Sequence, residues 1–193
     1  MNSSKSTKWN IKSGINILIW SLLLILLDQV TKILARLYLK DQPPKVLIDG
    51  VFELHYLENP WAAFSLGKGL NSFFLILVLI LTIGFSVFLI FLSFRVPAEK
   101  RFWFIHLLII LFLSGALGNF IDRVKFHSVT DFFYFKLINF PIFNVADIYV
   151  VAGAILFVVS FLLRSSIYEE LFPSRKKGAS KDNASHQDPD KKE

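Results

Sequence analysis

Four long apolar runs limit this chain to a small set of folds. They cover residues 15–39, 71–94, 102–120 and 145–163. About 20 apolar residues form a helix long enough to cross roughly 30 Å of hydrocarbon. Apolar residues make up 54% of the chain and the mean hydropathy is +0.53, which is well above the values of a soluble domain. The sequence therefore predicts an all-α membrane protein with four transmembrane helices.

The first apolar run has the position of a cleavable signal peptide but not its length or its cleavage site. It is too long for a signal h-region and ends without a small-x-small cleavage site. We therefore expect it to remain as the first span. The expected organisation is a short cytoplasmic segment over residues 1–12, a transmembrane domain over residues 13–165 and a largely disordered basic tail over residues 166–193.

A polar connection over residues 40–70 separates the first two spans. Pro43 and Pro44 end the first helix, and short strand-like segments follow around a turn at Asp49 and Gly50. This pattern predicts a small extramembrane loop that contains β structure. Loops of this length are usually functional, and we expect this one to lie over the site as a platform for an extended substrate.

Lysine and arginine are distributed unevenly between the two ends of the spans. The segment before the first span, the 95–101 loop and the chain from Arg164 onward hold 13 of the 21, and the other side holds 8. Because basic residues favour the cytoplasmic side, both termini are expected there and the 40–70 loop outside. The net charge of +6 thus indicates membrane orientation and not nucleic-acid binding, and the basic tail is expected to contact anionic lipid.

The stretch from Gly115 to Asp147 is polar although apolar runs surround it. It contains three aspartates, three asparagines and one arginine. Ionisable groups at the edge of a membrane segment are costly unless paired or hydrated, so they mark a functional site. Gly115, Asn119 and Asp122 share one helical face. Arg123 lies one turn beyond Asn119, so the polar stripe is expected to point into the bundle.

Asp131 and Asp147 lie on separate segments of this stretch. Pro141 disfavours a continuous helix between them, so they meet only if the connection folds back over the helix ends. Two carboxylates in one site repel, which raises one pKa and leaves an acid beside a base. Hydrolysis of a peptide bond by an activated water requires such a pair.

Structural roles explain the same residues without any chemistry. Asn144, three residues before Asp147, is a good helix cap, and the carboxylate then lies at the favourable end of the helix dipole. Asp122 beside Arg123 fits a simple ion pair. The spacing alone leaves capping, pairing and catalysis open.

The first span carries a second pair of charges. Asp28 and Lys32 stand four residues apart, so they can pair on one face of a helix. Pairing lowers the cost of keeping both charges near the membrane. On spacing alone, an interfacial ion pair with Lys32 reaching the headgroups explains them.

Short motifs along most of the chain resemble those of the bacterial lipoprotein signal peptidase family, also called signal peptidase II. The motifs are DQVTK (28–32), NPWAAF (59–64), GALGNFIDR (115–123), VTDFF (129–133) and FNVAD (143–147). They occur in the same order as in the family and extend from residue 28 to about residue 150. The resemblance implies a four-helix aspartic peptidase of the bacterial inner membrane. Such an enzyme removes the signal peptide of a prolipoprotein immediately before a diacylglyceryl-modified cysteine.

The resemblance also implies roles for individual residues. Asp131 and Asp147 match the catalytic dyad, which faces the extracytoplasmic side. Supporting or substrate-site positions match at Asp28, Lys32, Asn59, Asn119, Asp122, Arg123 and Asn144. Trp61 departs from the family pattern, which usually has a glycine there, and this affects the shape of the loop rather than the dyad.

Other chemistries have little support in the sequence. Cysteine is absent, which excludes disulfides and thiolate catalysis. The four histidines, His55, His106, His127 and His186, lack the spacing of metal ligands, so no metal and no cofactor are expected.

Two other functions would use the same polar residues. A transporter or ion relay requires polar groups through the depth of the membrane, whereas the charges here gather at one side. A structural scaffold gives no role to the six clustered charged residues, which are Asp28, Lys32, Asp122, Arg123, Asp131 and Asp147.

Overall fold

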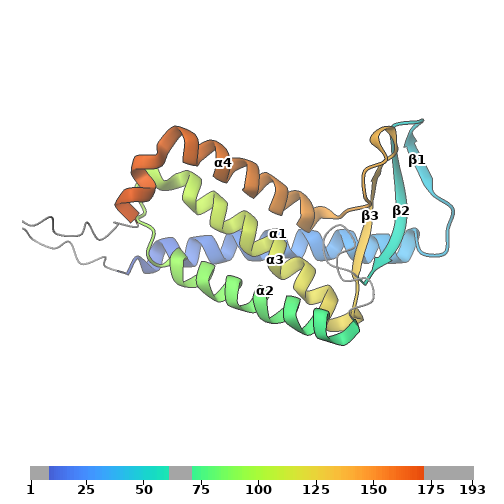
Figure 1. The fold of residues 1–193 in the computed structure, drawn as a ribbon, viewed down its shortest axis with the longest axis horizontal. Helices are drawn as coiled ribbons and strands as arrows, with labels where there is room; N and C mark the ends of the chain where they lie inside the picture. The colour runs from blue at the N-terminus through green and yellow to red at the C-terminus, as the bar shows by residue number, and fades with distance from the viewer. Residues whose placement is uncertain (1–8, 61–70, 172–193) are drawn as a thin grey trace, which may run out of the picture.

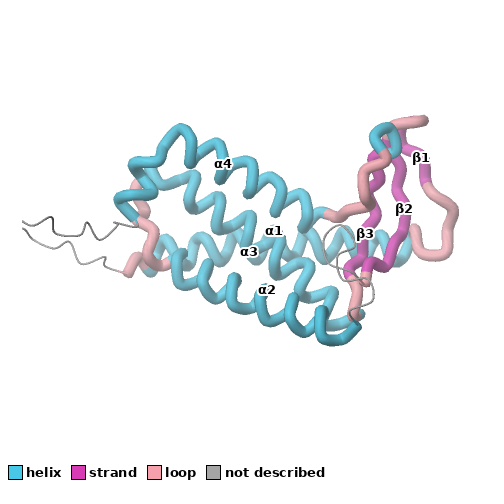
Figure 2. The backbone as a smooth tube through the Cα atoms, in the orientation of Figure 1, coloured by secondary structure: helices cyan, strands magenta, loops and turns pink. Residues whose placement is uncertain are grey.

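The computed structural model describes residues 9–60 and 71–171 as a helical bundle with a small sheet at one end (Figures 1 and 2). The long helices are α1 (Ile11–Tyr38), α2 (Asn71–Ser93), α3 (Trp103–Phe126) and α4 (Val145–Leu171). Each contains a segment long and apolar enough to cross a membrane, which confirms the prediction of four spans. Single 3₁₀ turns, η2 (Lys100–Phe102) and η3 (Lys136–Ile138), precede α3 and follow the third strand.

Helix α3 contacts the other three long helices, and its two halves differ in character. Its N-terminal half belongs to the apolar core, where Phe104, Leu108 and Leu113 pack with Ile17 and Leu89. Its C-terminal half carries the polar stripe. The helix therefore continues past residue 120, where the sequence analysis ended it, because the polar side chains face partners inside the bundle rather than lipid.

Two glycines let α3 approach its neighbours closely, as small residues do in membrane bundles. A Cβ on Gly115 would lie 2.6 Å from Val150 Cγ2 and 2.7 Å from the carbonyl oxygen of Ala146. A Cβ on Gly118 would lie 2.7 Å from Asp28 Oδ2. The backbones of α3 and α4, and the carboxylate on α1, can meet at this distance only because both side chains are absent.

The sheet lies at one end of the bundle and is formed by the α1–α2 connection and the α3–α4 connection. Strands β1 (Lys45–Ile48) and β2 (Phe52–Asn59) form the expected hairpin, and Gly50 in its turn has a φ of +68°. Strand β3 (Val129–Phe135) pairs antiparallel with β2, giving the order β1-β2-β3. The sequence predicted only a connection that folds back over the helix ends between Asp131 and Asp147, so β3 was not predicted.

The pairing of β2 with β3 gives the sheet two distinct faces. Leu57 lies opposite Asp131, and Glu58 lies opposite Thr130. Because side chains alternate along a strand, Asp131 points to one face and Thr130 to the other. The face that carries Asp131 turns towards the start of α4.

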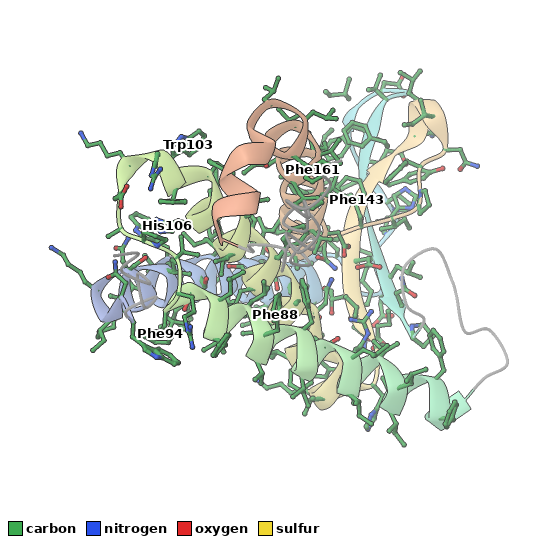
Figure 3. All side chains as sticks on the ribbon, turned by 60° about the vertical axis from the view of Figure 1, so that its left-hand side comes forward. Phe88, Phe94, Trp103, His106, Phe143 and Phe161 are labelled. Carbon is green, nitrogen blue, oxygen red and sulfur yellow. The ribbon has the colours of Figure 1, made fainter. Side chains whose placement is uncertain are left out.

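The opposite end of the bundle holds a separate set of contacts. Asn10 caps α1 by accepting a hydrogen bond from the Ser13 backbone N–H at 3.0 Å. His106 Nε2 lies 3.1 Å from both Ser13 Oγ and the carbonyl oxygen of Pro97, so it ties α1 to the α2–α3 connection. Figure 3 places His106 with Phe94 at this end, far from the sheet. His106 therefore has a structural role at this end of the bundle.

Some sequence-based expectations lie outside the described residues. These are the Trp61 departure, most of the 1–12 segment and the tail beyond residue 171. Helix α4 runs to Leu171, eight residues past the end of the fourth apolar run at 163.

Candidate active site

Asn144 bridges Asp131 on β3 and Asp147 on α4 by donating a hydrogen bond to each carboxylate. The Asn144 side chain donates from Nδ2 to Asp131 Oδ1 at 2.6 Å, and its backbone N–H donates to Asp147 Oδ2 at 3.0 Å. Asn59, the last residue of β2, donates to the other oxygen of Asp131 at 2.8 Å. Asn119 on α3 donates to the other oxygen of Asp147 at 2.9 Å. Every oxygen of the two carboxylates is therefore oriented by an N–H donor.

Asn144 also caps α4, so the capping role that the sequence left open is present. Its Oδ1 accepts a hydrogen bond from the Asp147 backbone N–H at 3.1 Å, which completes a reciprocal capping box. The side chain is fully buried. The same residue thus starts the helix and fixes the relative position of the two carboxylates.

The two carboxylates lie in different environments. Asp131 is buried, with 3% of its surface exposed, whereas Asp147 is half-buried. Burial, and secondly the nearby charge of Asp147, raise the pKa of Asp131 to about 7. At neutral pH the site therefore contains a carboxyl group that readily holds a proton beside a second carboxylate, as the sequence analysis expected.

Lys32 is the centre of a buried charge cluster behind the dyad. Its Nζ lies 3.0 Å from Asp28 Oδ2 and 3.6 Å from Asp122 Oδ2, and all three side chains are fully buried. It also donates to Asn119 Oδ1 at 2.9 Å, which links the cluster to the residue that holds Asp147. The predicted pairing with Asp28 is confirmed, and the alternative in which Lys32 reaches the headgroups is wrong.

Asp28 and Asp122 connect this cluster to the backbone. Asp28 Oδ1 accepts from the Ala146 N–H at 2.9 Å, at the start of α4. Asp122 Oδ2 accepts from the Thr130 N–H at 3.0 Å, next to Asp131 on β3. Each carboxylate thus anchors the segment that carries one member of the dyad.

The simple ion pair between Asp122 and Arg123 is not formed. Asp122 is instead 3.0 Å from Arg36 Nη2, an ion pair without hydrogen-bond geometry. Arg123 is half-buried, donates to the Asn119 carbonyl at 3.4 Å and is close enough to Asp147 to interact with its charge. Neighbouring residues on a helix point in different directions, which is why the adjacent pair separates.

Sequence reasoning missed Arg36, Gln29 and Thr130 as parts of this network. Arg36 Nε donates to Thr130 Oγ1 at 2.9 Å, and Gln29 Nε2 donates to the Gly118 carbonyl at 3.1 Å. Arg36 lies one helical turn beyond Lys32, so the spacing of Asp28, Lys32 and Arg36 was a usable signal.

The bundle and its polar end define an integral membrane enzyme. Residues 20–163 match the family model described as signal peptidase (SPase) II. The chain belongs to the signal peptidase II family and is a membrane peptidase.

Relatives and solved structures agree with this assignment. The lipoprotein signal peptidase of Clostridioides difficile is 39% identical over 75% of this chain and 93% of its own length. That of Clostridium tetani is 36% identical over 76% and 91%. A bacterial membrane enzyme solved by the in meso method at 2.3 Å is 27% identical with a TM-score of 0.68, covering 90% of this chain and 98% of its own. A second such structure, at 1.9 Å, is 29% identical with a TM-score of 0.66 and covers 81% and 97%.

Proposed function

We propose that this chain is an aspartic endopeptidase that removes the signal peptide of bacterial prolipoproteins by hydrolysing the bond before a diacylglyceryl-modified cysteine. The observation that carries the proposal is the pairing of Asp131 and Asp147 through Asn144. The family model and the names of the relatives support the substrate class.

In this mechanism Asp131 is the acid and Asp147 the base. The raised pKa of Asp131 favours its protonated form, and the half-buried Asp147 is the better placed of the two to contact water. Asp147 takes a proton from the water as its oxygen attacks the scissile carbonyl carbon. Asp131 gives its proton to the carbonyl oxygen, which yields a neutral gem-diol. Collapse of the diol breaks the C–N bond, one diol proton returns to Asp131, and Asp147 gives its proton to the leaving nitrogen.

The remaining polar residues position the dyad. Asn59, Asn119 and Asn144 hold the carboxylates through the hydrogen bonds described above. Asp28, Lys32 and Asp122 brace the segments behind them, and Arg123 supplies positive charge near the site. Preorganised donors of this kind act without reorganising during the reaction.

A lipid-modified substrate suits the surface beside Asp147. Val150 and Val151 lie one turn further along α4 and are 38% and 56% exposed. Residues three and four positions apart share a helical face, so an acyl chain lying along α4 would lead to the dyad. This exposed apolar surface favours a substrate that reaches the dyad from the bilayer.

The ion-relay alternative is disfavoured by where the charges lie. The described core of the other half of the bundle consists of apolar side chains such as Ile17, Phe104 and Ile109. A relay requires polar groups through the depth of the membrane, and this apolar core interrupts them.

We further infer an orientation in the bacterial cytoplasmic membrane with both termini inside. The N-terminal end of α1 and the C-terminal end of α4 lie at the end of the bundle away from the sheet (Figure 1). In the sequence, the segment before the first span, the 95–101 loop and the chain from Arg164 onward hold 13 of the 21 lysines and arginines. The site then opens to the extracytoplasmic side.

The proposal is tested by incubating the purified protein in lipid with matched lipidated and unlipidated precursors. We expect cleavage before the modified cysteine and a much lower rate without the lipid. Equal rates for both precursors would contradict the proposed specificity.

A further inference from the structure

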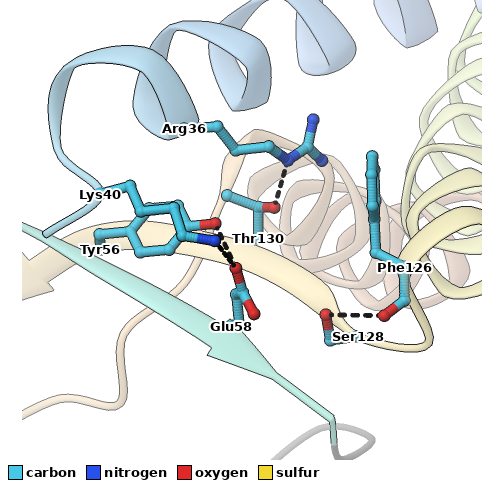
Figure 4. Close-up of a pocket in the computed structure, with 7 residues that line it drawn as sticks. All are labelled: Arg36, Lys40, Tyr56, Glu58, Phe126, Ser128 and Thr130. Carbon is cyan, nitrogen blue, oxygen red and sulfur yellow. Dashed lines mark hydrogen bonds and ion pairs between the residues drawn. The ribbon is translucent and has the colours of Figure 1, made fainter.

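A pocket lies between the C-terminal ends of α1 and α3 and the face of the sheet opposite Asp131. It has a volume of about 320 Å³. Its lining, shown in Figure 4, comprises Arg36, Lys40, Tyr56, Glu58, Phe126, Ser128 and Thr130. Thr130 and Glu58 are opposite each other in the β2–β3 pair and point away from the face that carries Asp131. The dyad does not line this pocket.

The pocket lies at the level where the spans end. Arg36 is in the last turn of α1, and Phe126 is the last residue of α3. Lys40 follows two residues after α1 ends. Phe126 is 49% exposed and Leu37, next to Arg36, is 69% exposed, so apolar surface borders the pocket on the membrane side. An occupant that enters from this side is in contact with lipid headgroups.

One nitrogen of the Arg36 guanidinium and one oxygen of the Glu58 carboxylate are available for further hydrogen bonds here. Arg36 donates from Nε to Thr130, its Nη2 forms an ion pair with Asp122 without a hydrogen bond, and within the described part of the chain its Nη1 forms no hydrogen bond. Glu58 Oε1 accepts from Lys40 Nζ and from the Tyr56 hydroxyl, both at 2.8 Å, whereas its Oε2 has no partner among the same residues. The hydrogen bond from Lys40, followed by that from Tyr56, lowers the pKa of Glu58, so this carboxylate is ionised at neutral pH.

We propose that this pocket binds the headgroup of a zwitterionic phospholipid in which a phosphate is joined to a primary ammonium, as in phosphatidylethanolamine. The phosphate is held by Arg36 Nη1 and by Lys40 Nζ, which uses one of its three N–H donors for Glu58. The ammonium donates to Glu58 Oε2. The acyl chains lie outside the pocket, against Leu37 and Phe126.

The same contacts discriminate against other common headgroups. A quaternary ammonium has no N–H to donate to Glu58, and it binds best in an aromatic cage. The single tyrosine here, Tyr56, already has Lys40 Nζ 5.8 Å from its ring centroid. An anionic headgroup without an ammonium leaves Glu58 Oε2 without a partner and places a phosphate beside a carboxylate of the same sign.

The test is a lipid competition on the purified full chain. Protein in detergent is mixed with equal amounts of phosphatidylethanolamine, phosphatidylcholine and phosphatidylglycerol with identical acyl chains, and bound lipid is counted by native mass spectrometry. We expect phosphatidylethanolamine to be enriched about two- to five-fold, the value of an exposed ion pair. Soluble glycerophosphoethanolamine should compete only weakly because it lacks the acyl chains.

Two substitutions test the ammonium contact and the phosphate contact separately. Glu58→Gln should abolish the preference for the ethanolamine lipid, while Lys40→Gln should lower the binding of all three lipids because all contain phosphate. Both break the Lys40–Glu58 pair, whose side chains are about half exposed, so the fold is retained. The matched control is Glu99→Gln, which breaks the similarly exposed Arg101–Glu99 pair at the other end of the bundle and should change nothing.

Three results would overturn the proposal. They are equal binding of the three lipids by the wild-type protein, a preference that survives Glu58→Gln, and full competition by the soluble headgroup. Unfolding temperatures of the variants within a few degrees of wild type establish that any loss of preference is local.

Discussion

Replacing Lys32 by methionine removes a fully buried cation and leaves two buried carboxylates behind it. Arg36 still pairs with Asp122, but Asp28 loses the ammonium group at 3.0 Å. Removing one partner of a buried ion pair costs about 3–5 kcal/mol, because the other charge remains without compensation. A chain of this size loses roughly 2–4 °C per kcal/mol, so the unfolding temperature should fall by about 6–20 °C.

The assay is thermal unfolding in detergent, followed by the loss of helical circular dichroism. Adding Asp28→Asn to Lys32→Met removes the uncompensated charge, and the double variant should regain about 2 kcal/mol relative to Lys32→Met. Lys40→Met is the control, since it breaks a half-exposed surface pair that contributes little to stability. Two results would contradict the role of the buried ion pair. They are an unfolding temperature of Lys32→Met equal to that of the wild type, and a further loss of stability, instead of a recovery, when Asp28→Asn is added.

Three further predictions concern the pH dependence, the packing and the topology. Cleavage should decline as the pH rises through about 7, because Asp131 then loses the proton it donates; a rate that stays constant to pH 9 would argue against this role. The folded state retains that proton between pH 3.8 and about 7 while the unfolded state releases it, so stability should fall across this window, and titrating the unfolding temperature of wild type against Asp131→Asn checks the sign. Gly118→Ala should lower the unfolding temperature and the activity, since its Cβ would lie 2.7 Å from Asp28 Oδ2, whereas Gly84→Ala, with open space around it, should not. A periplasmic reporter fused after Ser165 should be inactive, and an active one would reverse the orientation.

The helices were predictable because their signal is local. Runs of apolar residues long enough to cross a bilayer specify a span without any knowledge of the rest of the fold. The polar stripe from Gly115 to Asp122 also follows from helical periodicity alone. The pairing of Asp28 with Lys32 required only a spacing of four residues on a helix.

The pairing of strand β3 and the partners of Asp122 were not predictable in this way. Residues 129–135 read VTDFFYF and are rich in β-branched and aromatic residues, a strand signal that was not used, whereas their pairing with β2, some 70 residues earlier, leaves no local pattern. The contacts of Asp122 with Arg36 and Thr130 depend on the same long-range arrangement. Adjacent residues in the sequence suggested Arg123 as the partner, whereas the geometry of the helix separates them.

The direct test of the central claim is precursor cleavage by Asp131→Asn and Asp147→Asn at matched membrane abundance and unfolding temperature. Asparagine keeps the size of the side chain and much of its hydrogen bonding, and Asp49→Asn in the exposed β1–β2 turn is the control. A general acid or base contributes about 10²- to 10⁴-fold, so each dyad variant should lose at least that factor while the control retains full activity. Near wild-type cleavage by either variant would contradict the claim and leave that aspartate with a structural role alone.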